Sequence, residues 1–306
     1  MADGIPAEST PGISCKRKDV LRLTISDYRR WADRVTGAFE KAAKFLHALR
    51  IYDARDVPYH AQFVPLAAIL AALDERADHD GIRSKIARWY WCGVFGELYG
   101  GATETRFAKD LPDVLSWLEG GPEPATIADA NFAPARLLTL RTRNSAAYKG
   151  LYALLMRDGC LDFRTGYGID LQMYFDEKID IHHIFPQKWC KANDIDAKRC
   201  DSVVNKTPIS ARTNRMIGGN APSVYLSRVQ KSAGTDAGRM HEILRSHLID
   251  PVPLGADDFH SFFETRSHAL LERIERAMGK AISRALVDAE ESSETVEYED
   301  EGEDAA

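Results

Sequence analysis

Cysteine and long apolar runs are both scarce in this chain of 306 residues. Its five cysteines are an odd number and include no C-x-x-C pair, which indicates reduced thiols rather than a disulfide scaffold. The longest apolar candidate, residues 63–73, contains Pro65 and falls short of the roughly 20 residues that cross a bilayer. The first twelve residues lack the basic-then-apolar plan of a secretory signal. These absences predict a cytoplasmic protein that does not contact a membrane.

Several catalytic motifs are absent as well. The chain has no G-x-S-x-G elbow, no G-x-x-x-x-G-K-[ST] loop and no G-x-G-x-x-G turn. Nothing therefore indicates a serine hydrolase, a P-loop nucleotidase or a dinucleotide enzyme. Cys190 and Cys200 are separated by nine residues and lack C-x-x-C partners, a spacing that does not favour a structural zinc site.

Negative charge is concentrated near one end of the chain. The net charge is −6, but ten acidic residues lie between positions 288 and 304, and no Lys or Arg follows Arg284. Setting those ten charges aside turns −6 into +4 for residues 1–287, which is compatible with binding phosphate groups. Residues 284–306 are expected to form a disordered acidic tail. An alternative hypothesis is that this tail competes with DNA for a basic cleft.

Much of the first half of the chain has the periodicity of helices. Between Tyr28 and Leu49, apolar residues recur every three or four positions, which predicts a long helix with one apolar face. Ser26 and Asp27 suit its N-cap and first turn. Further helices are expected over residues 63–74, 84–99, 111–118 and 141–156. The aromatic residues of the helix over 84–99 suit core packing better than stacking on bases.

The most informative segment is residues 180–186, with the sequence DIHHIFP. Two histidines beside an acid, in an apolar run closed by a proline, predict a strand that carries polar groups to a cleft. Residues 203–210 (VVNKTPIS) predict a second strand, and residues 211–215 (ARTNR) predict the start of a helix. Because side chains alternate along a strand, His182 and His183 are expected on opposite faces. A His–His pair alone is common, but this order of elements favours a nuclease site.

These segments resemble the HNH nuclease region at the C-terminal end of GmrSD-type modification-dependent restriction endonucleases. The phrases that carry the resemblance are IDIHHIFPQKWC, DSVVNKTPIS, ARTNRMIGGNAPSVYL and ERAMGKAI, and it extends upstream through RWYWCGVFGELYGG and LRTRNSAAYKGLYALL. The HNH domain of the RNA-guided CRISPR effector shows a similar strand and the same nine-residue step between two asparagines. The resemblance implies a ββα-metal fold, hydrolysis of DNA phosphodiester bonds and a role in restriction or phage defence.

The chain is expected to divide into five parts. Residues 1–18 form a flexible leader, residues 19–157 a helical lobe, and residues 158–235 the ββα-metal module. Residues 236–283 form C-terminal helices that pack on the core, and the acidic tail follows. The predicted fold class is mainly α with a small α+β module.

The resemblance implies a role for each matching residue. His183 fits the general base that takes a proton from the attacking water, and His182 and Asn214 fit the ligands of one divalent metal ion. Asn205 fits the middle asparagine, which supports catalysis by tying the loop between the strands and orienting the base. Asp180 is expected on the face of His182, as a partner of the ligands or as an extra ligand.

One position departs from the family pattern. Many relatives have an acidic residue where this chain has His182. Mg²⁺ prefers hard oxygen ligands, whereas imidazole suits softer ions such as Mn²⁺ and Ni²⁺. We therefore expect Mn²⁺ or Ni²⁺ to support cleavage at least as well as Mg²⁺, unless Asp180 supplies the missing charge.

Seven cations are expected to contact DNA phosphates. Arg215, next to Asn214, is the best single candidate, and a basic helix that begins at residue 141 is expected beside the site. The seven cations are Arg141, Arg143, Lys149, Lys188, Lys206, Arg212 and Arg215.

GmrSD-type enzymes also carry an N-terminal nucleotide-dependent domain that senses DNA modification. Its DGQQR-like signature is absent from this sequence. Either a separate protein supplies the sensor or the chain acts alone. The alternative function is a catalytically silent subunit that docks on DNA or on a partner protein.

Overall fold

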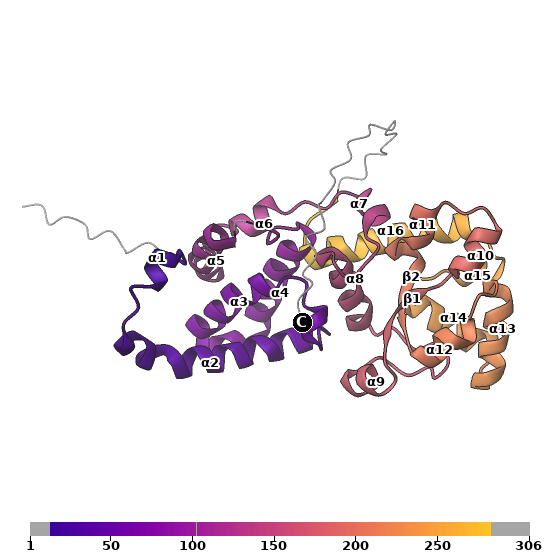
Figure 1. Cartoon of the computed structure of the whole chain (residues 1–306), viewed down its shortest axis with the longest axis horizontal. Helices are drawn as coiled ribbons and strands as arrows, with labels where there is room; N and C mark the ends of the chain where they lie inside the picture. The colour runs from indigo at the N-terminus through magenta and orange to yellow at the C-terminus, as the bar shows by residue number, and fades with distance from the viewer. Residues whose placement is uncertain (1–12, 102, 283–306) are drawn as a thin grey trace, which may run out of the picture.

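The computed structural model describes residues 13–101 and 103–282, and most of its elements are helices (Figure 1). In this described part, two strands form one small antiparallel sheet. The predicted fold class, mainly helical with a small β-containing module, is confirmed at this level. Residues 1–12 of the predicted leader and the predicted tail, 284–306, lie outside the described residues. None of the described helices is long and apolar enough to span a membrane.

The first half of the chain forms a helical lobe at one end of the elongated molecule (Figure 1). Its helices are α1 (Arg17–Val20), α2 (Ile25–Ala48), α3 (His60–Leu73), α4 (Asp80–Phe95), α5 (Thr103–Leu118), α6 (Ala125–Asp129), α7 (Arg136–Thr139) and α8 (Ala146–Arg157). Two 3-10 turns, η1 (Ala54–Asp56) and η2 (Asp74–Asp78), flank α3.

The second half forms the opposite end of the molecule (Figure 1). It begins with α9 (Leu171–Asp176), β1 (Asp180–His183), α10 (Gln187–Ala192), α11 (Ala197–Asp201), the 3-10 turn η3 (Val203–Asn205), β2 (Lys206–Ile209) and α12 (Ala211–Ile217). The remaining helices are α13 (Pro222–Ala233), α14 (Ala237–Ser246), α15 (Pro251–Gly255) and α16 (Phe259–Met278). We call residues 158–235 the strand module.

Helix α2 begins earlier than the sequence predicts. Thr24 is its N-cap: the hydroxyl oxygen accepts from Asp27 N at 3.1 Å, and the Asp27 carboxylate accepts from Thr24 N at 3.0 Å. This capping box satisfies two backbone N–H groups at once. The N-cap predicted at Ser26 was therefore wrong by two residues.

The predicted apolar face of α2 is buried only in its second half. Ala42 and Leu46 are buried, but Tyr28 is 68% exposed and Trp31 is 44% exposed. Helix α2 has 24 residues and its main packing partner α3 has 14, so α3 does not cover the first turns of α2. Periodicity shows which side chains share a face, and the length of the neighbouring helix decides how much of that face is buried.

The aromatic residues of α4 lie inside the core. Trp89, Tyr90, Trp91 and Phe95 are at most 1% exposed. The indole N–H of Trp89 donates to Asp110 Oδ1 at 3.0 Å, which satisfies a polar group that burial would otherwise leave unpaired. These rings are part of the packing between helices and are not free to stack on bases.

Two predicted helices have different bounds in the structure. Helix α5 extends over Thr103–Leu118, well beyond the predicted 111–118. Helix α8 begins only at Ala146, so Arg141 and Arg143 lie in the loop before it, and the predicted basic helix face was wrong. The loop is held by a tertiary bond, because Leu140 O accepts from Val203 N at 2.8 Å.

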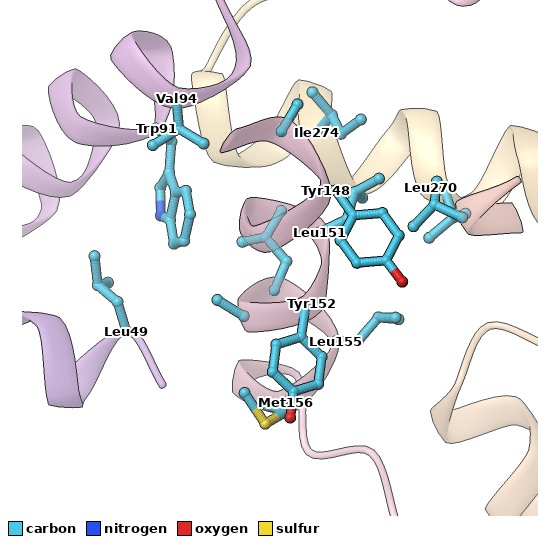
Figure 2. Packing of buried hydrophobic residues seen from close by; sticks show 14 of the residues in the cluster. Leu49, Trp91, Val94, Tyr148, Leu151, Tyr152, Leu155, Met156, Leu270 and Ile274 are labelled. Atoms are coloured by element: carbon cyan, nitrogen blue, oxygen red, sulfur yellow. The ribbon is translucent and has the colours of Figure 1, made fainter. Parts of the chain in front are cut away.

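Helix α8 lies at the centre of the core. Ten of its twelve residues are buried. Figure 2 shows its side chains between Leu49 and Trp91 of the helical lobe on one side and Leu270 and Ile274 of α16 on the other. Helix α16 also packs on α4, where Arg88 Nε donates to Met278 O at 3.0 Å. Helices α8 and α16 thus join the two halves of the molecule.

Strands β1 and β2 pair antiparallel, and their register fixes which residue of β2 lies opposite each motif residue of β1. His183 lies opposite Lys206, and Asp180 lies opposite Ile209. The ladder continues beyond the strands, because Ile184 N donates to Asn205 O at 2.9 Å. All four residues of β2 are buried, and those of β1 are half-buried.

A buried arginine fixes β2 to α16. Arg266 is fully buried, and its guanidinium donates to Val204 O, to Lys206 O at 2.8 Å and to His247 O at 3.2 Å. Burial lowers the pKa of Arg266 to about 9, because the charged form loses its hydration. The three accepting carbonyls hold the guanidinium in place, so a residue near the end of the described chain positions the strand that pairs with the two histidines.

Candidate active site

A cleft opens where β1 meets α12. It has a volume of about 290 Å³. His182, His183 and Asn214 all contribute to its walls, so the fold brings the predicted base and the predicted metal ligands to one place. The other lining residues are Ile181, Pro186, Gln187, Lys188, Ile217, Gly218 and Gly219.

A larger cavity of about 560 Å³ lies between α2, α4 and α16. Its lining includes four arginines but no histidine or cysteine. We place the candidate site in the smaller cleft, because that is where groups able to transfer a proton and to bind a metal converge.

His183 is bonded to a carboxylate that the sequence motif did not include. Its Nε2 lies 3.1 Å from Asp201 Oδ1, and the same oxygen accepts from Gln187 Nε2 at 2.8 Å. An ionised carboxylate can only accept, so the proton of the neutral ring lies on Nε2. The lone pair is then on Nδ1, which makes Nδ1 the basic nitrogen of His183.

The surroundings of His183 favour its neutral form. Burial lowers the pKa of His183 below its ordinary value, Lys206 lowers it further, and Asp201 opposes both. For Asp201, burial raises the pKa, but the hydrogen bonds from Gln187 and His183 hold it below the ordinary value overall. A neutral imidazole beside an ionised carboxylate is the arrangement that a general base requires.

His182 lies near a carboxylate that already has a partner. Asp180 forms an ion pair with Arg143 and accepts from Ile181 N at 2.6 Å. Burial lowers the pKa of His182, so this imidazole is also available in its neutral, metal-binding form. Asp180 is not among the residues that line the cleft.

Asn214 is positioned by the start of α12. Ser210 caps this helix, its hydroxyl accepting from Thr213 N at 3.1 Å. The buried carboxylate of Asp162 accepts from Ser210 N at 2.9 Å and from Thr213 Oγ1 at 3.0 Å. Asp162 thus fixes the turn between β2 and α12, and so the direction in which Asn214 enters the cleft. Asn214 itself remains half-exposed.

Asn205 is fully buried, and its side-chain amide forms hydrogen bonds with backbone groups. Its Oδ1 accepts from Phe185 N at 2.8 Å, and its Nδ2 donates to Phe185 O and Cys200 O, both at 2.9 Å. One amide therefore ties the segment after β1 to the end of α11. Because Asp201 follows Cys200, this bond also fixes the carboxylate that holds His183.

Three of the seven predicted DNA contacts are engaged inside the protein. Arg143 pairs with Asp180 and with Asp56, the latter at 3.3 Å. Lys149 donates to Val57 O at 3.1 Å. Lys206 is 8% exposed and donates to Arg141 O at 2.7 Å. Arg143 and Lys206 thus join the helical lobe to the strand module, whereas the bond of Lys149 lies within the helical lobe.

The other four predicted contacts are exposed. Lys188 belongs to the cleft, where its side chain lies across Gly219: a Cβ at Gly219 would come within 2.8 Å of Lys188 Cδ. Arg212 and Arg215 are on α12, the helix that carries Asn214. The fourth, Arg141, precedes α8. Three of these four exposed cations therefore lie in the cleft or on the helix that carries Asn214.

The donors at the cleft fit a borderline metal ion. His182 and Asn214 are two neutral donors, and the nearby carboxylate of Asp180 is held by Arg143. Mg²⁺ requires hard oxygen ligands, whereas imidazole nitrogen suits Mn²⁺ and Ni²⁺.

No known protein-family model matches the chain. The chain is similar to the protein named Uncharacterized protein MJ0686 of Methanocaldococcus jannaschii, with 27% identity over 291 residues. The match covers 86% of this chain and 49% of that protein, so the chain spans about half the length of this relative. The relative's name assigns it no activity.

Proposed function

We propose that the chain is a divalent-metal-dependent endonuclease of the HNH type, which hydrolyses DNA phosphodiester bonds in restriction or phage defence. One observation carries the proposal. A histidine bonded to a carboxylate, His183 with Asp201, lines the same cleft as His182 and Asn214. Both histidines lie on β1 and Asn214 lies on α12, which follows β2, so the elements occur in the strand–strand–helix order of an HNH site.

The roles follow from the hydrogen bonds at the cleft. Asp201 keeps the proton of His183 on Nε2 and fixes the ring, so Nδ1 takes a proton from the water that attacks the phosphorus. Asn205 holds the end of α11, which carries Asp201. Lys188, Arg212 and Arg215 contact the phosphates on either side.

His182 and Asn214 would hold the metal ion. When bound, such an ion neutralises charge on the phosphate and stabilises the leaving 3′ oxygen. The burial that lowers the pKa of His182 keeps its ring neutral and ready to bind.

Cleavage of supercoiled plasmid tests the proposal. In the absence of a chelator, Mn²⁺ or Ni²⁺ is expected to support nicking at least as well as Mg²⁺, because His182 and Asn214 are neutral donors. EDTA is expected to stop it. Equal cleavage in EDTA would exclude a metal-dependent mechanism, and cleavage in Mg²⁺ with none in Mn²⁺ would contradict the assigned ligands.

The pH dependence of cleavage tests the pairing of His183 with Asp201. The neutral imidazole is the active form, and it prevails above the pKa of His183. Asp201 raises that pKa, so Asp201→Asn is expected to lower it and to move the acidic limb of the pH–rate profile to lower pH. The plateau rate is expected to fall by about tenfold, because Asn orients the ring less firmly. A limb that stays in place or moves to higher pH would contradict the pairing.

A second candidate function is a docking subunit without turnover, working with a separate modification-sensing protein. The exposed first half of α2, with Tyr28 and Trp31, favours it, because exposed apolar patches often mark protein contacts. A gel-shift assay beside the plasmid assay distinguishes the two. DNA binding without cleavage in any of the metals, on modified and unmodified DNA, would support the docking subunit.

A further inference from the structure

The thiol of Cys200 lies beside the pair formed by His183 and Asp201. The ligand atoms of these three side chains are all within 4.8 Å of one another. Among residues 13–101 and 103–282, no other group of three or more His, Cys, Asp or Glu side chains is gathered in this way. Cys200 is 6% exposed, and the side chain of His183 is 23% exposed, so the group reaches from the core to the cleft.

We propose that His183, Cys200 and Asp201 form a second metal site, which binds a soft divalent cation such as Zn²⁺ and inactivates the base. A thiolate, an imidazole and a carboxylate, with water in the fourth position, are the ligands of an open zinc site. In a tetrahedral site the ligand atoms lie about 3.5 Å apart. His183 Nε2 lies 3.1 Å from Asp201 Oδ1, and the ligand atoms of all three side chains lie within 4.8 Å of one another, so a small movement of the side chains would bring them to that spacing.

Charge at the group favours a cation. The Cys200 thiol gives its proton to solvent on binding, so the thiolate and Asp201 bring two negative charges. A hydrogen bond with Cys190 lowers the pKa of Cys200, which makes the thiolate easier to form. Lys206 is a nearby cation that opposes the metal, but its ammonium is also bonded to Arg141 O. The net charge of the group remains negative.

This site differs from the one assigned to catalysis. His182 and Asn214 offer nitrogen and amide oxygen to a borderline ion, whereas Cys200 offers sulfur, which selects Zn²⁺ over Mg²⁺ and Mn²⁺. The two sites are joined through His183, which lines the cleft and belongs to the cysteine-containing group.

A metal ion in this second site would change the tautomer of His183, and the ring could then no longer act as a base. The metal takes the lone pair of Nε2, so the ring proton must move to Nδ1. Nδ1 then has no lone pair with which to accept a proton from water. This consequence for cleavage rests on the proposed nuclease function, whereas the binding of the metal does not.

Binding is tested with Co²⁺ alone on the full chain, because Co²⁺ bound to a thiolate gives a charge-transfer absorption band. The wild-type chain is expected to show this band and to lose it when Zn²⁺ is added. Cys200→Ser is expected to abolish the band and to weaken metal binding at least 100-fold, on the order of the largest losses caused by changing the partner of a ligand. Asp201→Asn is expected to weaken binding as well.

Cys190→Ser is the matched control. Cys190 is buried beside Cys200, but its sulfur is not one of the three clustered atoms. This variant is expected to keep the Co²⁺ band. A band that persists in Cys200→Ser, or that never forms in the wild type, would overturn the proposal.

Inhibition gives a second, separate readout. Zn²⁺ is expected to stop Mn²⁺-supported cleavage, and Cys200→Ser is expected to need at least ~10-fold more Zn²⁺ for the same inhibition. Equal inhibition of both proteins would mean that the effective zinc binds elsewhere, and would overturn the proposal. A chain that binds Co²⁺ through Cys200 but never cleaves DNA would keep the metal site and refute the nuclease function instead.

Discussion

Replacing His183 by alanine is expected to lower metal-dependent cleavage of plasmid DNA by about 10³-fold, the range of a lost general base. The methyl group can neither accept the proton of the attacking water nor bond to Asp201. The side chain of His183 is only 23% exposed and makes no phosphate contact in its assigned role, so the affinity for DNA should change little. Single-turnover nicking rates and a gel shift on the same protein measure the two effects separately.

The matched control is His182→Ala, in the neighbouring residue of the same strand. Here a metal ligand is lost rather than a base, so raising the Mn²⁺ concentration is expected to restore part of the activity. The same concentration should restore nothing in His183→Ala. If metal rescues His183→Ala and not His182→Ala, the two roles are exchanged. If neither variant loses activity, the cleft is not the catalytic site.

The largest effect on stability is expected from Asn205→Ala, which should lower the free energy of unfolding by about 3 kcal/mol. The change removes three hydrogen bonds in a fully buried place. It takes the Asn205 partner from Phe185 N and Cys200 O, and it leaves Phe185 O with the bond from Cys190 Sγ at 3.6 Å. Buried polar groups that lose a partner cost more than exposed ones, because water cannot replace it. Urea unfolding followed by circular dichroism gives the midpoint and slope from which the free energy is obtained.

Asn193→Ala provides the comparison on the surface. Asn193 follows α10, is exposed, and donates one bond to Trp189 O at 2.9 Å. Asn193→Ala is expected to lower the free energy of unfolding by less than about 0.5 kcal/mol, as for most surface changes. Asn205→Asp, which keeps the acceptor for Phe185 N but loses both donors, should destabilise as much as Asn205→Ala. A loss at Asn205 no larger than at Asn193 would show that the loop is held by other contacts.

The sequence predicted the parts of the site that lie close along the chain. The two strands and α12 are each marked by local patterns: an apolar run closed by Pro186, a second run over 203–210, and the helix start over 211–215. Within the second run only Lys206–Ile209 form β2, because Val203–Asn205 form a 3-10 turn. Local patterns fix which side chains share a strand or a helix turn. The alternation of side chains along a strand predicted opposite faces for His182 and His183, and it was the family resemblance that assigned both to one site with Asn214. All three line one cleft.

The hydrogen-bond partners of the site residues could not be predicted from local patterns. Asp201 meets His183 only because α11 ends beside β1, and Asp162 reaches Ser210 across 48 positions of the chain. No periodicity connects residues of that kind. The sequence also did not show which cations are engaged inside the protein. Lys206 is buried and Arg143 is paired with two carboxylates, although both resemble free surface charges in the sequence.

The bonds of Arg266 to β2 also determine when the cleft can form during synthesis. A ribosome releases β1, β2 and α12 well before it has made α16, so the emerging strands lack the guanidinium that their carbonyls bind. Domains fold as units once their last essential segment has left the exit tunnel. A nascent chain should therefore carry both histidines but no finished cleft until α16 has emerged, and the nuclease activity proposed above would appear only from that point on.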